Sequence, residues 1–306
     1  MTDGAGAAAA TDPVACPSCG EVADAEASWC EACGSDLTHA PPASEPDTTD
    51  LGWIACATDK GLRRSANEDA VVVLDATPDA GPDTAVLVVC DGVGSTDSPA
   101  AAARAAATTA AQSLELSVRG GTEPSTALER SARAAQEAVI DVTRSDRPTT
   151  GALPPSSTFV AAVARRTDTG VAGSVAWLGD SRAYWLGTEA LVLTDDHVWD
   201  GPAEAEQAGS ITRWLGVDAV DLVPSVVDFE TEGEGRLLLC SDGLWGYLRE
   251  ADDMAGKIGE IGGQSPVALV GALIDFANAA GGRDNIAVAI ADFAHEPEDQ
   301  RTRDEQ

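Results

Sequence analysis

Acidic residues recur next to the short apolar runs of this sequence, where strands are expected to begin or end. Their motifs are Glu68-Asp69 before residues 70–74, Asp91-Gly92 after residues 85–90, Gly179-Asp180 after residues 171–178, Asp242-Gly243 after residues 236–240, and Asp284-Asn285 before residues 286–292. Taken singly, an Asp-Gly pair is an ordinary turn. Taken together, carboxylates at several strand ends can converge on one edge of a pair of sheets. Oxygen ligands of this kind suit Mg²⁺ or Mn²⁺.

The expected strands and helices that must position these residues do not alternate regularly along the chain. The apolar runs at 85–90, 159–164, 171–178, 236–240 and 286–292 are expected to be strands. Helices are expected at 99–117, 123–144 and 265–280, the first and last of which begin close to a proline. Because the two long helices follow each other without a strand between them, the order favours helices layered on mainly antiparallel sheets over a βαβ alternation.

A separate metal site is predicted near the N-terminus. Cys16, Cys19, Cys30 and Cys33 form two Cys-x2-Cys pairs ten residues apart, each pair followed by a glycine. Four thiolates close a tetrahedral Zn²⁺ site and leave no position for water, so the predicted zinc is structural. The segment resembles small bacterial zinc-ribbon modules. It has no Lys or Arg between the outer cysteines, which favours docking to a protein. The alternative is an unstructured stretch in which the cysteines have no common role.

Composition restricts the partners of the chain. Its 306 residues carry a formal charge of −32, which repels nucleic acids and anionic lipids, and no apolar run is long enough to span a bilayer. The N-terminus lacks the features of a signal peptide, and Cys56, Cys90 and Cys240 lie singly in apolar runs, as expected for core residues of a cytoplasmic protein. The predicted division is a flexible tail at 1–15, a zinc ribbon at 16–34, a linker at 35–50, a body at 51–293 and a disordered acidic tail at 294–306.

Eight motifs in the body occur in a family-specific order. They are TDKGLRRSANEDA, VVCDGVGS, STFVAAV, WLGDSRAYWL, LTDDH, ITRWLGVD, LLLCSDGLW and RDNIAV, and they lie between residues 58 and 288. In this order they resemble the metal-dependent protein phosphatase family (PPM, or type 2C), bacterial type. The resemblance implies an α+β fold, a four-layer α/β/β/α sandwich of two antiparallel sheets flanked by helices, with the small zinc ribbon added at the N-terminus. It also implies hydrolysis of phosphoserine and phosphothreonine in proteins, opposing bacterial Ser/Thr kinases.

The resemblance also implies a role for each motif residue. Asp91 bridges two Mn²⁺ or Mg²⁺ ions, and the Gly92 carbonyl binds one of them. Asp242 and Asp284 complete one site, Asp69 contributes to the other with Glu68 nearby, through water, and Asp180 pairs with Asp242 around a third ion. Arg64 holds the substrate phosphate. The expected catalytic residues are thus Arg64, Asp91 and Asp242, and the expected ions are two or three Mn²⁺ or Mg²⁺ and one structural Zn²⁺.

The implied chemistry leaves one role unassigned. A water bridging two cations loses its proton near neutral pH and attacks phosphorus in line, while the metals and Arg64 neutralise the phosphoryl oxygens. Val93 stands where animal members carry a histidine, the candidate acid for the leaving oxygen, so that acid is not identified here. Ser95 replaces a second glycine, and the flap at residues 196–214 is shorter than usual, which leaves substrate specificity open.

Several polar residues near these motifs also allow purely structural interpretations. Arg64 could be a surface residue beside Arg63, and Asn67 and Asn285 could only turn the chain. For Asp196, His197 and Arg182, a structural role is favoured over a chemical one. The Ser157-Thr158 pair is expected to pack near the cleft without a chemical role.

Two further functions compete with the phosphatase prediction. The first is a catalytically silent module that senses phosphoproteins, which predicts missing metal ligands, and none is missing. The second is an adaptor in which the zinc ribbon has the main role. The expected partners are phosphorylated proteins and a docking partner for the ribbon.

Overall fold

The computed structural model describes residues 14–15, 22–23, 27–29, 31, 46–78, 81–145, 153–201, 209–263 and 265–294. The chain divides into two units, Met1–Ser44 and Glu45–Gln306. In the first unit, β1 (Val14–Ala15) and β2 (Val22–Ala23) pair antiparallel. The strand β1 lies within the range predicted as a flexible tail. The four predicted zinc ligands, Cys16, Cys19, Cys30 and Cys33, lie outside the described residues.

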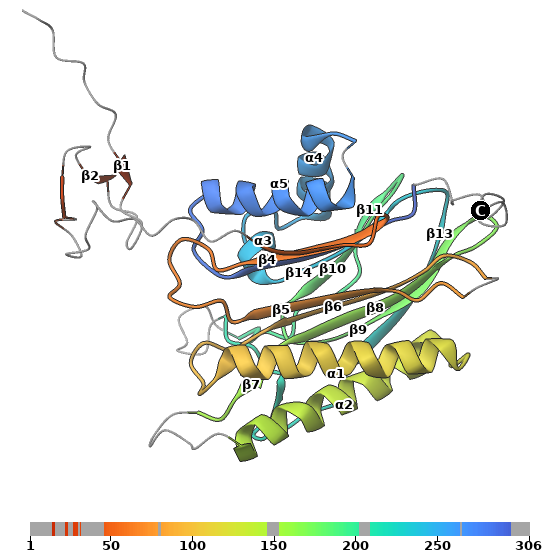
Figure 1. Ribbon diagram of the computed structural model, residues 1–306, viewed down its shortest axis with the longest axis horizontal. Helices are drawn as coiled ribbons and strands as arrows, with labels where there is room; N and C mark the ends of the chain where they lie inside the picture. Colours follow the sequence, from red (N-terminus) through yellow and green to blue (C-terminus); the bar gives the residue numbers. More distant parts are fainter. Residues whose placement is uncertain are drawn as a thin grey trace, which may run out of the picture. The chain divides into compact units, whose positions relative to one another are not determined.

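The second unit is built on two antiparallel sheets (Figure 1). In spatial order, the five-stranded sheet consists of β13 (Ser225–Glu232), β9 (Gly170–Leu178), β8 (Phe159–Arg166), β6 (Thr84–Asp91) and β5 (Asp69–Asp75). The six-stranded sheet consists of β11 (Ala190–Val192), β10 (Arg182–Leu186), β14 (Arg236–Cys240), β15 (Ile286–Asp292), β4 (Ile54–Asp59) and β3 (Asp47–Asp50). A short ladder joins β7 (Ser156–Ser157) to β12 (Leu215–Gly216).

Helices cover the outer face of each sheet. The long helices α1 (Pro99–Arg119) and α2 (Pro124–Ser145) lie on the five-stranded sheet, and α4 (Ala251–Ile261) and α5 (Pro266–Ala279) lie on the six-stranded sheet (Figure 1). A single turn, α3 (Asp242–Trp245), follows β14. The predicted four-layer α/β/β/α architecture is therefore confirmed.

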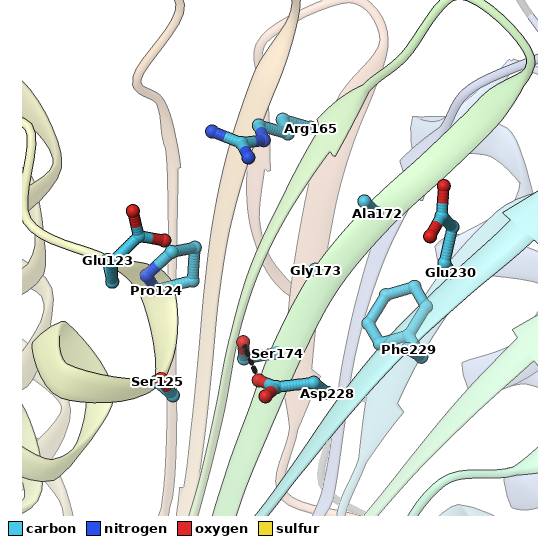
Figure 2. A pocket seen from close by; sticks show the side chains of 10 residues that line it. All are labelled: Glu123, Pro124, Ser125, Arg165, Ala172, Gly173, Ser174, Asp228, Phe229 and Glu230. Carbon is cyan, nitrogen blue, oxygen red and sulfur yellow. Dashed lines mark hydrogen bonds between the residues drawn. The ribbon is translucent and has the colours of Figure 1, made fainter.

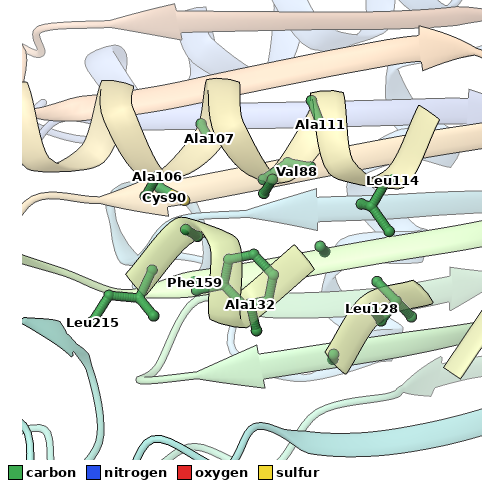
Figure 3. Packing of buried hydrophobic residues seen from close by; sticks show 14 of the residues in the cluster. Val88, Cys90, Ala106, Ala107, Ala111, Leu114, Leu128, Ala132, Phe159 and Leu215 are labelled. Atoms are coloured by element: carbon green, nitrogen blue, oxygen red, sulfur yellow. The ribbon is translucent and has the colours of Figure 1, made fainter. Parts of the chain in front are cut away.

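Three hydrophobic layers hold the sandwich together. The layer under α1 is made mostly of alanines, and Ala106, Ala107 and Ala111 share a cluster with Val88 and Cys90 of β6 (Figure 3). Alanine side chains allow a helix to approach the sheet closely, and close packing of this kind is typical of protein interiors. Larger side chains fill the layer between the sheets and the layer under α5. Buried strands and helices thereby form a rigid base for the loops at the strand ends.

The sequence boundaries of the body need one adjustment. Strand β3 lies within residues 35–50, which composition assigns to a linker, and it pairs with β4 so that Thr49 is opposite Cys56. All four side chains of β3 are exposed. The strand β3 forms through main-chain pairing at the edge of the sheet. Its polar sequence has no apolar periodicity from which a strand could be predicted.

The three isolated cysteines are buried and free, as predicted for core residues. Burial raises the pKa of the Cys56 thiol to about 11, which disfavours a reactive thiolate. No helix in the part of the chain that the structure describes combines the length and apolar composition needed to cross a membrane.

Candidate functional site

Two carboxylates meet at the ends of neighbouring strands. Asp69 is the first residue of β5 and Asp91 the last residue of β6, and the antiparallel register places them directly opposite each other. Side chains at such positions have Cβ atoms about 4.5–5.5 Å apart, and like charges there repel. The Ser241 hydroxyl, which follows β14 of the other sheet, donates to Asp69 Oδ2 at 2.7 Å. This contact brings the two sheets together at one acidic edge.

The main chain of Asp91 is held by a Ser-Thr pair. The Asp91 N–H donates to Thr158 Oγ1 at 2.9 Å, and its carbonyl oxygen accepts from the Ser157 hydroxyl at 2.9 Å and from the Thr158 N–H at 2.8 Å. The next residue, Gly92, must be small because a Cβ there would lie 2.8 Å from the Glu68 carbonyl oxygen. Ser157 and Thr158 therefore position Asp91, a more specific role than the packing role expected for them.

Asn285 ties the segment before β5 to the start of β15. Its side chain is 3% exposed, accepts from the Glu68 N–H at 2.9 Å, and donates to the carbonyl oxygens of Lys60 and Ala66 at 2.7 and 2.8 Å. One expectation was that Asn285 only turns the chain. These three contacts show that it also holds Glu68 close to residue 285, and so close to Asp284. The sequence signals only an Asp-Asn turn here, because its partners lie more than 200 residues away.

Arg64 lies at the open side of this edge. It donates to Asp284 Oδ2 at 2.6 Å, while 43% of its side chain remains exposed. Its guanidinium also lies next to the turn at Gly94, where an added Cβ would be 3.2 Å from Arg64 Nη1 and 3.0 Å from Glu68 Oε2. The hydrogen bond with Asp284, followed by neighbouring carboxylates, raises the pKa of Arg64. Arg64 is thus a fixed cation next to the acidic cluster, and more than a chance surface arginine.

Asp180 is placed by the residues that follow β11. The Gly179 N–H donates to His197 Nδ1 at 3.2 Å, so the ring proton is on Nε2, which donates to Ser225 Oγ at 2.9 Å. The His197 ring also stacks on Trp177, with centroids 5.8 Å apart. Burial lowers the pKa of His197 and favours this neutral form. His197 therefore holds Gly179 and, through it, the position of Asp180.

Arg182 and Asp196 form a second structural unit beside Asp180. The Arg182 guanidinium donates to both carboxylate oxygens of Asp196 at 2.9 and 2.8 Å, and its carbon lies 3.8 Å from the centre of the Trp245 ring. Both charged side chains are mostly buried. These contacts support the structural interpretation of Arg182 and Asp196.

The carboxylates of the cluster perturb one another. Burial, followed by the charges of Asp284, Asp180 and Asp69, raises the pKa of Asp242 to about 8. Burial likewise raises the pKa of Asp69 to about 7 and that of Asp180 to about 6. The pKa of Asp91 lies well above its ordinary value because of burial and the charges of Asp69, Asp242, Asp180 and Asp284. Bringing these groups together is unfavourable unless cations or protons offset their charge.

The donor set fits hard divalent cations. Asp69 Oδ1 and Asp242 Oδ1 are buried oxygens for which the described structure provides no hydrogen-bond partner. Among the described residues, no group of three or more His, Cys, Asp or Glu side chains is already arranged to hold a metal ion. Mg²⁺ sites do not require a closed cage of side chains, because the ion keeps several waters and takes few carboxylates.

The structure thus brings all the predicted residues of the body to one edge. These are Arg64, Glu68, Asp69, Asp91, Gly92, Asp180, Asp242 and Asp284. A hollow of about 310 Å³ elsewhere, between β9, β13 and the start of α2, contains none of them (Figure 2). Its Ser174 donates to Asp228 at 2.5 Å, and Arg165 lies on its wall. That hollow is therefore not part of the acidic site.

Comparisons with known proteins identify the family and the fold. The sequence model of the family Protein phosphatase 2C matches residues 63–261. The Mycobacterium tuberculosis serine/threonine phosphatase PstP/Ppp is similar in structure, with 25% identity, a TM-score of 0.56, and coverage of 79% of this chain and 98% of that chain. PppA of Pseudomonas aeruginosa, described as a regulatory component of T6SS, has 25% identity and a TM-score of 0.58, with 80% and 98% covered.

A more distant structure shares the fold. Stp1 from Staphylococcus aureus, a serine/threonine phosphatase, is 20% identical with a TM-score of 0.59, and the match covers 81% of this chain and 96% of that chain. No curated protein sequence matches the chain. The family match includes the segments that carry Arg64, Asp69, Asp91, Asp180 and Asp242. From this match and the two-sheet fold we conclude that the chain belongs to the protein phosphatase 2C family of serine/threonine phosphatases.

Proposed function

We propose that this chain hydrolyses phosphoserine and phosphothreonine in proteins, using two Mn²⁺ or Mg²⁺ ions and a third where Asp180 and Asp242 pair. One observation carries the proposal: carboxylates from both sheets meet at one edge and include buried oxygens that lack hydrogen-bond partners. A further relative supports the choice of ion. The catalytic domain of PstP, 23% identical over 81% of this chain with a TM-score of 0.56, has a structure in complex with two manganese ions.

The residues of the cluster divide into two groups of metal ligands. Asp91 would be shared by both ions, with Asp242 and Asp284 on one side and Asp69 and Glu68 on the other. The Gly92 carbonyl would complete the set. When bound, the cations supply an acidified water and neutralise charge on the phosphoryl oxygens.

The side chains of the protein then have distinct tasks. Arg64 binds the phosphate, because its guanidinium has five N–H donors and only part of them is used by Asp284. Ser157 and Thr158 fix the Asp91 main chain, and Ser241 orients Asp69. Val93 has no proton to donate, so the leaving oxygen is protonated by another group.

The test is hydrolysis of phosphothreonine and phosphoserine peptides by the purified chain. Phosphate release is expected with Mn²⁺ or Mg²⁺ and not with a chelator in excess, because the acidic cluster cannot hold a phosphate without cations. A phosphotyrosine peptide serves as the comparison substrate. Absence of turnover on every phosphopeptide and on an aryl phosphate would contradict the proposal. Binding of phosphopeptides without turnover would instead assign the chain to the silent sensing class.

Reversal of bacterial Ser/Thr kinase signalling in the cytoplasm is part of the same proposal. Its support is the sequence resemblance together with the free, buried cysteines of the body. The physiological substrates would then be phosphorylated proteins of that signalling system.

We further propose that residues 16–34 form a zinc ribbon that holds one structural Zn²⁺ and docks a protein partner. The β1–β2 pair supports this, because Cys16 and Cys19 lie in the sequence between the two strands. The full chain is expected to contain about one zinc per molecule by elemental analysis, since four thiolates form one closed site. The double variant Cys16→Ser/Cys19→Ser is expected to lose it.

Cys56→Ala is the matched control for this zinc prediction, because Cys56 is buried in the body. Zinc that stays with the double variant would refute the ribbon. A deletion that tests partner docking should end at Ser44, because β3 belongs to the six-stranded sheet. Peptide hydrolysis should survive that deletion if the ribbon only targets the enzyme.

A further inference from the structure

An apolar pocket lies directly beside the acidic cluster. Its volume is about 320 Å³, and its apolar walls are Val93, Leu153, Ile211 and Trp214. Val93 is only two residues from Asp91, so the pocket begins within about 7 Å of chain from the centre of the cluster. The pocket therefore begins next to the site proposed to bind the phosphorylated residue.

Main-chain contacts hold the walls of the pocket in place. The Val93 N–H donates to the Ser156 carbonyl oxygen at 3.0 Å, and the Asp97 N–H donates to the Leu153 carbonyl oxygen at 2.8 Å. Ile211 pairs with Val198 in an isolated β-bridge. Each wall is thus fixed by the backbone, so the pocket is a built feature of the fold.

Trp214 forms the aromatic wall and is itself positioned. Its indole N–H donates to Asp218 Oδ1 at 3.0 Å. The following strand, β12, pairs with β7, so that Leu215 lies opposite Ser157, the residue that donates to the Asp91 carbonyl. One ladder therefore connects the aromatic wall to the main chain of the central aspartate.

Exposed apolar residues occur on the pocket wall and in the loop that follows Trp214 in the sequence. Leu153 is 54% exposed, and the loop after Trp214 exposes Val217, Val220 and Val223 by 52%, 98% and 71%. Exposed apolar surface of this kind next to a site commonly marks binding of another protein. The net charge of −32 argues against anionic membranes as the partner.

We infer that this pocket takes a large apolar side chain of the phosphoprotein substrate, one that lies within about two residues of the phosphorylated serine or threonine. The inference rests on the proposed phosphatase function and adds a determinant of specificity to it. Among the residues that line the pocket, Asp218 is the one with a charged side chain. An acidic residue of the substrate would therefore meet both an apolar wall and a like charge.

The test uses phosphothreonine peptides that differ at single positions within two residues of the phosphothreonine. At one of these positions, leucine is expected to give a kcat/KM at least about 10-fold higher than glycine, the scale of discrimination that an apolar pocket provides. Glutamate at that position is expected to give the lowest value. Trp214→Ala should reduce the leucine preference to near unity while the peptide with glycine at that position, which has no side chain to place in the pocket, is hydrolysed as before.

Val220→Ala is the matched control, since Val220 is apolar and exposed but does not line the pocket. It should keep the leucine preference. If Trp214→Ala loses turnover on the glycine peptide as well, Ile211→Ala takes its place as the wall variant. Equal kcat/KM for all peptides in the wild type, or a preference that survives the wall variants, would overturn the pocket inference and leave the phosphatase function intact. Absence of turnover on peptides and aryl phosphate alike would overturn both.

Discussion

Asp91→Asn is expected to lower kcat for a phosphothreonine peptide by on the order of 10³-fold at saturating Mn²⁺, the scale of losing one central electrostatic contact in an active site. Asparagine has nearly the size of aspartate and can keep the main-chain contacts to Ser157 and Thr158. It has no charge, however, with which to hold two cations. The measurement is steady-state phosphate release as a function of Mn²⁺ concentration.

The same substitution should separate function from stability. Without metal, Asp91 faces the charges of four other aspartates, so Asp91→Asn removes repulsion and should not lower the thermal unfolding midpoint in chelator. For the wild type, saturating Mn²⁺ is expected to raise the midpoint by roughly 5–10 °C, since binding at 100 times Kd stabilises by about 2.7 kcal/mol. The variant should gain clearly less.

Asp275→Asn provides the control for both measurements, because Asp275 is exposed on α5, away from the acidic edge. It should leave activity and the Mn²⁺-induced shift unchanged. Full activity of Asp91→Asn, or an unaltered shift, would show that the cations are not held by this cluster.

Arg64→Ala is expected to lower kcat/KM for phosphopeptides by roughly 10- to 100-fold, because a hydrogen bond to a charged group contributes about 1.5–3 kcal/mol. Arg64 is anchored by Asp284 yet 43% exposed, so it can bind a phosphate without first being ordered. Most of the loss should appear in KM if the arginine binds ground state and transition state equally. Arg64→Lys should recover only part of it, because an ammonium lacks the planar fork.

The neighbouring Arg63 offers a matched control for that prediction. It is also exposed, and its own N–H donates to the Gly282 carbonyl, a contact that Arg63→Ala would keep. Arg63→Ala should change kcat/KM little. An equal loss in the two alanine variants would mean that general positive charge near the site, and not the placement of Arg64, binds the substrate.

Several local elements of this protein could be predicted from the sequence alone. Pro99 is the first residue of α1, a helix position that favours proline, and Ser265 and Pro266 are the N-cap and first residue of α5. The strands β14 and β15 have the boundaries that their apolar runs predict. These features depend on neighbours within a few residues, so composition and spacing are sufficient to predict them. The placement of aspartates at strand ends follows from the same signals.

Tertiary structure alone decided how those strand ends meet. Ser241 reaches Asp69 across 172 residues of sequence, and Asn285 reaches Lys60 across 225. The first contact exists because the two sheets pack face to face, and the second because β15 lies beside β4. No local pattern specifies either arrangement. The polar strand β3 and the pocket walls contributed by Leu153 and Trp214 have the same origin. Hydrogen bonds to distant backbone groups leave no periodicity in the chain, and only the assembled sheets bring their partners within reach.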